Sequence, residues 1–124
     1  MYHNIGAVYN AQGEYSQALK YYEQALEILL KALGPNHPSV ATAYMSIGRV
    51  YNDQGEYSQA LKYYEQTLEI QLKTLGPNHP SVATTYNNIG LVYNDQGKYS
   101  QALKYYDQTL EMQLKTLGPN HPSV

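Results

Sequence analysis

The sequence repeats itself with a period of 42 residues. Residues 1–42 and 43–84 differ at 8 of 42 positions, and residues 43–82 and 85–124 differ at 7 of 40 positions. Self-similarity at a fixed period of this length is typical of repeat proteins, in which each unit buries its apolar face against its neighbours rather than in one central core. We therefore expect a single domain over residues 1–124, built from the units 1–42, 43–84 and 85–124.

Each unit is predicted to form two helices. In the middle unit Tyr44, Ile47, Gly48 and Tyr51 lie at positions i, i+3, i+4 and i+7, which share one face of a helix. Gly55 is suited to end that helix, because glycine readily adopts the left-handed conformation found at helix ends. The same pattern in all three units predicts an all-α fold with helices near residues 2–11, 15–32, 38–53, 57–74, 80–95 and 99–116.

The second helix of the middle unit runs up to a stiff linker, residues 76–80, which contains two prolines. Pro80 fits the first turn of the following helix, where its missing N–H is not needed. We expect the apolar stripe of this second helix to consist of Leu61, Tyr64, Leu68 and Leu72.

Composition excludes several classes of function. A formal net charge of −2 gives no general attraction to nucleic acid or to an anionic membrane surface, so neither is expected as a partner. The absence of cysteine excludes disulfides and thiolate-bound metals. No apolar run approaches the roughly 18–20 residues that a membrane-spanning helix needs. All 15 aromatic residues are tyrosines, which suit tight helix seams whose edges reach water.

The period alone does not choose between families, since HEAT, armadillo and WD40 units have similar lengths. The residue pattern is more specific. In the middle unit the spaced residues are Tyr44, Ile47, Gly48, Tyr51, Ala60, Tyr64 and Thr67. The pattern recurs as Tyr2, Ile5, Gly6, Tyr9, Ala18, Tyr22 and Ala25, and as Tyr86, Ile89, Gly90, Tyr93, Ala102, Tyr106 and Thr109. It resembles the tetratricopeptide repeat (TPR) signature, with tyrosine in place of the usual Trp and Phe.

The units are longer than the ordinary TPR of ~34 residues. This long form, with its His-Pro-x-Val-Ala-Thr segment, resembles the repeats of kinesin light chains and of nephrocystin-3-like proteins. The resemblance implies a right-handed superhelical solenoid of three TPR-like repeats, in which the first helix of each unit lines a concave groove. Cytoplasmic residence is implied by the resemblance only.

Neither a metal site nor an active site is expected. His37, His79 and His121 recur 42 residues apart in successive linkers, so they do not converge on one ion, as zinc ligands must. The chain has no cysteine nucleophile and no glycine-rich phosphate loop. Near-identical repeats do not supply the unique constellation that an enzyme needs. We therefore predict a protein that is not an enzyme and has no cofactor.

Differences between the units concentrate in the first helix, which holds 5 of the 8 differences between the first two units and 4 of the 7 between the last two. The resemblance implies that this face is the floor of a peptide groove, where asparagines bond the backbone of an extended ligand. The candidate binding residues are His3, Asn4, Ala7, Asn10, Met45, Ser46, Arg49, Asn52, Asp53, Asn87, Asn88, Leu91, Asn94 and Asp95.

Two interpretations of this face stay open. In the first, constant asparagines hold any extended peptide, while His3, Met45, Arg49 and Leu91 set the side-chain preference. In the second, these positions are exposed and drift freely, and the changes in the second helix are equally neutral. The TPR class that grips a chain terminus uses lysines on this floor, and here Arg49 is the only cation, so that ligand class is disfavoured.

The ends of the sequence suggest a different role. Tyr2 lies inside an expected first helix, and residues 122–124 repeat the start of a further one, so we expect a piece of a longer array. Solenoids usually carry polar capping helices at their ends. Without them, the last helix of one copy should accept the first helix of another, in a head-to-tail contact that propagates unless it closes into a ring. The alternative to a peptide-binding scaffold is therefore a module that stacks end to end.

Overall fold

The computed structural model describes residues 2–117, and over these residues it is entirely helical, with no strand. Its helices are α1 (Tyr2–Ala11), α2 (Tyr15–Leu33), α3 (Pro38–Asp53), α4 (Tyr57–Thr74), α5 (Pro80–Asp95) and α6 (Tyr99–Leu117). The predicted bounds are confirmed, since only α2 and α6 extend one residue beyond them. The all-α prediction is confirmed as well.

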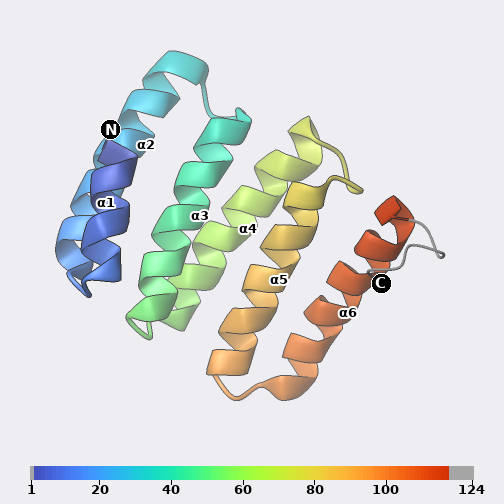
Figure 1. Ribbon diagram of the computed structural model, residues 1–124. Coiled ribbons are helices and arrows are strands. Elements are labelled where there is room, and N and C mark those ends of the chain that lie inside the picture. The colour runs from blue at the N-terminus through green and yellow to red at the C-terminus, as the bar shows by residue number, and fades with distance from the viewer. Residues whose placement is uncertain (1, 118–124) are drawn as a thin grey trace.

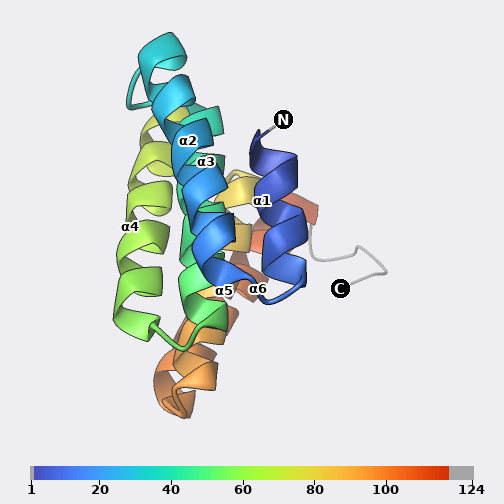
Figure 2. The ribbon, with the colours of Figure 1, turned by 90° about the vertical axis from the view of Figure 1, so that its left-hand side faces the viewer.

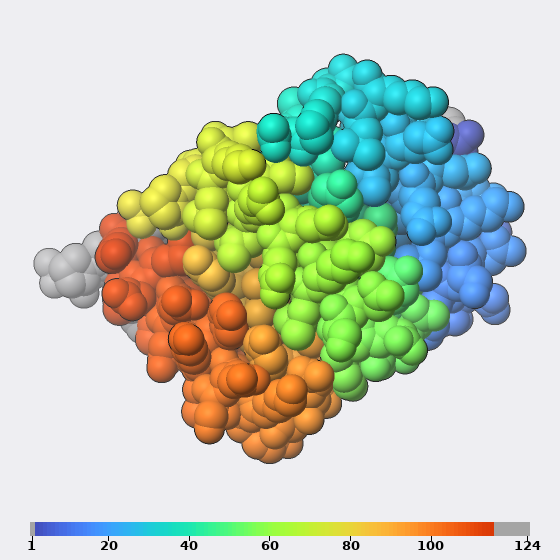
Figure 3. Space-filling model, turned by 180° about the vertical axis from the view of Figure 1, so that it is seen from behind, coloured from blue at the N-terminus to red at the C-terminus, as the bar shows by residue number. Residues whose placement is uncertain are grey.

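The helices form three antiparallel hairpins arranged in two layers. Helices α1, α3 and α5 lie on one side of the molecule (Figure 1), whereas α2, α4 and α6 cover the opposite side (Figure 3). Each helix packs mainly on those that precede and follow it in the chain, and the hairpins follow one another from left to right in Figure 1. Figure 2 looks along the array from the side of the first hairpin, with α1 and α2 toward the viewer and α5 and α6 behind. We call the surface made by α1, α3 and α5 the helix-A face.

Glycine and histidine set the ends of the helices. Gly55 has a φ of 81°, which lets the chain reverse between α3 and α4. At the start of α5 the Nδ1 atom of His79 accepts a hydrogen bond of 3.0 Å from the backbone N–H of Ser81, with Pro80 at the first helical position. His37 caps α3 through Ser39 in the same way. His37 and His79 therefore act as helix N-caps, a role that the sequence alone did not indicate.

Within each hairpin a glycine lies directly against a tyrosine ring. A Cβ atom added to Gly48 would lie 3.0 Å from Tyr64 Cε1 and 3.2 Å from the backbone oxygen of Ala60. The other two hairpins repeat the contact, with Gly6 against Tyr22 and Gly90 against Tyr106. The glycine and the second-helix tyrosine of the TPR-like pattern thus meet in each hairpin.

The apolar clusters join consecutive hairpins. Ala60 and Tyr64 of α4 pack with Ile89 and Val92 of α5, so that the second helix of one repeat receives the first helix of the next. The expected stripe of α4 is wrong at Leu72, which is 39% exposed. The buried polar residue next to it, Gln71, faces the following helix instead.

A second tyrosine contact joins the two helices of each hairpin. The ring of Tyr63 stacks on Tyr51, with ring centroids 5.6 Å apart, and is tilted against Tyr44 at 6.0 Å. Stacked and tilted aromatic pairs at such distances add to the stability gained from burial. Equivalent triads exist in the other two hairpins, formed by Tyr2, Tyr9 and Tyr21 and by Tyr86, Tyr93 and Tyr105.

Candidate functional site

The helix-A face carries two bridges between asparagine and aspartate. The Nδ2 atom of Asn10 in α1 donates a hydrogen bond of 3.1 Å to Asp53 in α3, and Asn52 in α3 donates one of 3.1 Å to Asp95 in α5. Each bridge therefore ties the first helix of one repeat to that of the next. The side-chain amides of Asn10 and Asn52, which were predicted to hold a ligand backbone, are thus bonded within the protein.

One end of this asparagine series is open. Asn94, which follows Asn10 and Asn52 at the same repeat position, is exposed and forms no side-chain hydrogen bond with residues 2–117. The side-chain oxygens of Asn10 and Asn52 are buried and accept no hydrogen bond within that part of the chain. Of these three asparagines, Asn94 alone therefore offers an exposed side-chain amide to a ligand backbone, which is fewer than the sequence suggested.

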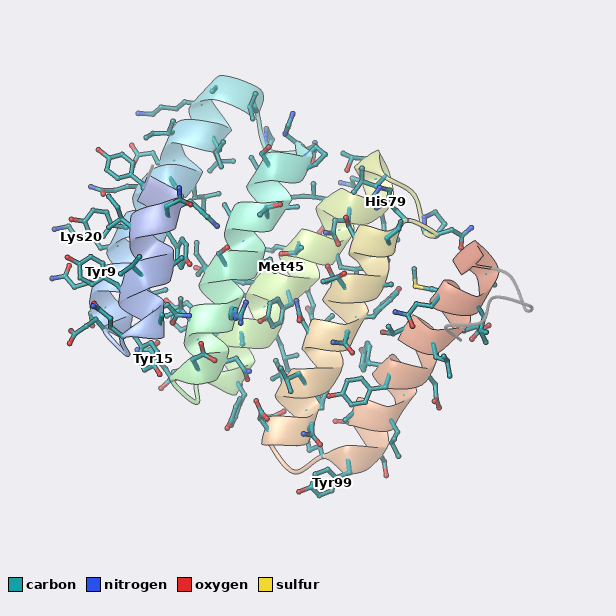
Figure 4. The ribbon with its side chains drawn as sticks, in the orientation of Figure 1. Tyr9, Tyr15, Lys20, Met45, His79 and Tyr99 are labelled. Atoms are coloured by element: carbon teal, nitrogen blue, oxygen red, sulfur yellow. The ribbon has the colours of Figure 1, made fainter. Side chains whose placement is uncertain are left out.

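Three other candidate residues are occupied partly or wholly by packing. Met45 of α3 is half-buried against the apolar cluster between α4 and α5 (Figure 4). The hydroxyl of Ser46 donates to the backbone oxygen of Thr42 at 3.2 Å. His3 lies against the ring of Tyr22, with ring centroids 5.1 Å apart. Met45 and His3 thus contribute to contacts between helices, whereas the hydroxyl of Ser46 is bonded within α3.

The freely accessible part of the face lies on α3 and α5. Arg49 is exposed and forms no hydrogen bond or ion pair with residues 2–117. Leu91, one repeat later, is 42% exposed. Asn87 is exposed on α5, and Asn88 is half-buried beside it. On α1 the equivalent surface is formed by the exposed residues Asn4 and Ala7.

The electrostatic setting of Arg49 is mixed. Burial raises the pKa of Tyr64 to about 12, with the charge of Arg49 opposing the rise and the carboxylates of Asp53 and Asp95 adding to it. Burial also raises the pKa of Tyr22, and Arg49 again acts in the opposite direction. Arg49 therefore lies near two tyrosines that stay protonated at neutral pH, and the carboxylates of Asp53 and Asp95 lie near one of them, Tyr64. A guanidinium so placed can bind a carboxylate of a ligand.

Neither a cluster of metal ligands nor a membrane-spanning helix is found in the described residues. Within residues 2–117 no three His, Cys, Asp or Glu side chains converge as metal ligands would. His121 lies outside the described residues. No helix in the described part of the chain is long and apolar enough to span a membrane.

The sequence profile of the tetratricopeptide repeat family matches residues 1–73, 48–115 and 81–124. The chain belongs to this family. TPR proteins generally serve as scaffolds for protein–protein interaction. A comparison with curated proteins finds no match.

Solved structures show the same TPR solenoid. One contains nearly identical TPR-like repeats assigned to a kinesin light chain of Podosopora anserina, with 30% identity, a TM-score of 0.81 and coverage of 98% of this chain and 58% of that one. BtubC from P. vanneervenii aligns over 97% of this chain and 47% of its own, with 23% identity and a TM-score of 0.83. The TPR domain of Arabidopsis FLU has 23% identity and a TM-score of 0.76 and covers 93% and 92% of the two chains. The chain thus spans about half the length of the first two relatives. The expected likeness to kinesin light chain repeats is confirmed, and the last two matches show the fold alone.

Proposed function

We propose that this chain is a non-catalytic scaffold that binds an extended peptide segment along the helix-A face, over α3 and α5. The observation that supports this most directly is the exposed pair Arg49 and Leu91, which occupy the same repeat position on the successive helices α3 and α5. Arg49 offers a bidentate donor to an acidic side chain, and Leu91 offers an apolar contact. The open Asn94 supplies both a donor and an acceptor for the ligand backbone.

The Asn–Asp bridges separate the residues that join the repeats from those that are free to contact a ligand. Asn10 and Asn52 hold neighbouring repeats in register, so the ligand is contacted by the residues that vary between units. A peptide with one acidic and one apolar side chain fits the pair of Arg49 and Leu91.

The test is selection of peptides from a displayed random library on the wild-type chain, followed by titration of the selected peptides against variants. Arg49→Ala should weaken binding about 10–150-fold, as expected for the loss of a charge-assisted hydrogen bond of about 1.5–3 kcal/mol. Leu91→Ala should weaken it less. Glu69→Ala, at an exposed ion pair with Lys73 on α4, is the matched control and should leave the affinity unchanged. Peptides that bind the Arg49→Ala and Leu91→Ala variants as well as the wild type would refute the proposal.

A second candidate function, end-to-end stacking of copies, is supported by a separate observation. Val8 of α1 is 58% exposed, whereas the equivalent Val50 and Val92 are 0% exposed because a preceding second helix covers them. At the other end Tyr99 and Leu103 of α6 are 64% and 60% exposed, and Tyr99 projects from the start of its helix (Figure 4). The α1 helix of one copy can thus pack on α6 of another as α5 packs on α4.

Sedimentation velocity tests the stacking directly. Wild-type chains should associate as their concentration rises into the high micromolar range, and Val8→Asp and Leu103→Glu should each abolish this association. Glu27→Gln, at an exposed ion pair on α2, is the control. A wild-type chain that stays monomeric throughout would exclude stacking and leave peptide binding untouched.

A further inference from the structure

The two seams between consecutive repeats differ in chemistry. In the seam of α2 with α3, a small hollow of about 230 Å³ is lined by Ala25, Leu29 and Ala43 together with His3, Ser39 and Thr42. Leu29 and Ala43, which occupy the repeat positions of Gln71 and Thr85, are both apolar. In the seam of α4 with α5, the hydroxyl of Thr85 donates a hydrogen bond of 2.6 Å to the side-chain oxygen of Gln71. Thr85 is 0% exposed and Gln71 is 5% exposed, so this bond is fully buried.

Both partners change together between the seams. Leu29 and Gln71 are 42 residues apart, and so are Ala43 and Thr85. A mixed seam with glutamine opposite alanine would bury a carboxamide without a partner, which is the costly half of a broken hydrogen bond. Thr85 is less sensitive, because its hydroxyl also lies 3.1 Å from the backbone oxygen of Ser81. A glutamine at the position of Gln71 therefore favours a following helix that carries a hydroxyl at the position of Thr85.

The last hairpin has a groove on the side where a following repeat would pack, and this groove is lined in part by polar side chains. The groove, of about 590 Å³, lies between α6 and the start of α5. Gln113, Tyr106 and Asn87 line it, and they occupy the repeat positions of Gln71, Tyr64 and Met45, which pack against α5 in the filled seam. The groove is thus the place that the first helix of a following repeat would take.

Some polar side chains of this groove form no hydrogen bond within the described residues. The hydroxyl of Thr109 already donates to the backbone oxygen of Ala83 at 3.3 Å. Gln113 and Asn87 are exposed and form no side-chain hydrogen bond within residues 2–117. Because asparagine stands here in place of Met45, the open seam is more polar than the filled one.

We propose that the groove on α6 is a docking site for the first helix of a further TPR-like repeat that presents a hydroxyl at the position of Thr85. The inference rests on the stacking function proposed above and names the chemistry of the helix that is accepted. The hydroxyl donates to Gln113 as Thr85 does to Gln71, while apolar residues of the helix pack on Tyr106 and Leu110. The first helix of a second copy has Met1 at this repeat position and offers no hydroxyl, so it is the weaker occupant.

The test extends the chain at its C-terminus by a copy of residues 83–116, which continues the repeat in register after Val124. Two versions carry either threonine or alanine at the position equivalent to Thr85, and each is made with Gln113 and with Gln113→Leu. Amide hydrogen exchange of residues 99–115 reports whether the added helix covers α6.

With Gln113 present, the threonine version should protect α6 at least about fivefold better than the alanine version, as expected for a buried carboxamide left unpaired at about 1–3 kcal/mol. With Gln113→Leu this preference should vanish or reverse. Equal protection by both versions in the presence of Gln113 would overturn the proposed chemistry but not stacking. If neither version protects α6, or if a library-selected peptide shields Gln113 instead, the groove does not receive a helix and the proposal fails. Sedimentation of the unextended chain reports separately on the stacking function.

Discussion

Replacing Tyr64 by alanine is expected to destabilise the array more than any other single truncation of a tyrosine. Its side chain is 3% exposed, lies against Gly48 and packs in one cluster with Ile89 and Val92. Truncation of a fully buried large aromatic residue costs about 3–5 kcal/mol, through lost burial and the cavity left behind. The backbone of two helices borders this site, so the cavity cannot close easily, and we expect a loss in this range.

Tyr106 is the matched control for this truncation. Its ring lies on Gly90 as the ring of Tyr64 lies on Gly48, but it is only half-buried because no further helix covers it in the described chain. Tyr106→Ala should therefore cost roughly half as much, in proportion to the apolar area removed from water. Tyr64→Phe, which keeps the ring, should stay within about 1 kcal/mol of the wild type.

Urea denaturation followed by far-UV circular dichroism measures all three variants. The reasoning is refuted if Tyr64→Ala costs less than about 1 kcal/mol, or if Tyr64→Ala and Tyr106→Ala cost the same. The second result would mean that α5 contributes nothing to the burial of Tyr64.

The other predictions concern pH, capping and the Asn–Asp bridges. Burial raises the pKa of Tyr64 to about 12 from the usual value of 10.0, so the unfolded chain loses this proton at a lower pH than the folded chain does. The free energy of unfolding should therefore fall by up to about 2.7 kcal/mol between pH 10 and 12. The urea midpoint of the Tyr64→Phe variant should lack this contribution to the pH dependence. His79→Ala should cost about 1 kcal/mol in thermal or urea denaturation through the lost N-cap, whereas His79→Asn should restore most of it; equal losses would argue against capping. Asn52→Ala should cost about 1 kcal/mol, and in a double-mutant cycle with Asp95→Ala that cost should largely disappear; additive losses would show that the bridge contributes nothing.

The sequence was sufficient to predict the helices because each boundary is marked three times by the same residues. Glycine at positive φ and proline at the first helical position set the ends of the helices, and neither depends on tertiary contacts. The contact of Gly48 with Tyr64 was also predictable, since a family pattern places the small and the large residue on facing helices. These features are local or belong to one hairpin.

Contacts between hairpins were harder to predict. Asn52 and Asp95 are 43 residues apart, one more than the repeat, and their meeting depends on how far successive first helices are displaced. Leu72 was assigned to the buried stripe by periodicity, although the following helix lies over Gln71 instead. The stacking of Tyr63 on Tyr51 depends likewise on the crossing of two helices. Each of these needs coordinates, because hydrophobic periodicity defines a face but not the neighbour that covers it.

The differences between units can now be divided by whether packing accounts for them. The changes from Leu29 to Gln71 and from Ala43 to Thr85 form a matched pair in a buried seam, which argues against the interpretation that changes in the second helix are neutral. The series Ala7, Arg49 and Leu91 is different.

Those three side chains are exposed, occupy one repeat position and form no hydrogen bond within residues 2–117. No buried contact accounts for the differences among them, so we interpret their variation as either drift or selection by a ligand. Under drift, exchanging Arg49 with Leu91 in a double variant (Arg49→Leu with Leu91→Arg) would leave both stability and peptide binding unchanged, because the two positions are equivalent in the repeat. Under ligand selection stability would again be unchanged, but library-selected peptides would bind at least about tenfold more weakly, since their acidic and apolar residues would meet the wrong partners. The exchange variant therefore separates the two interpretations without disturbing the fold.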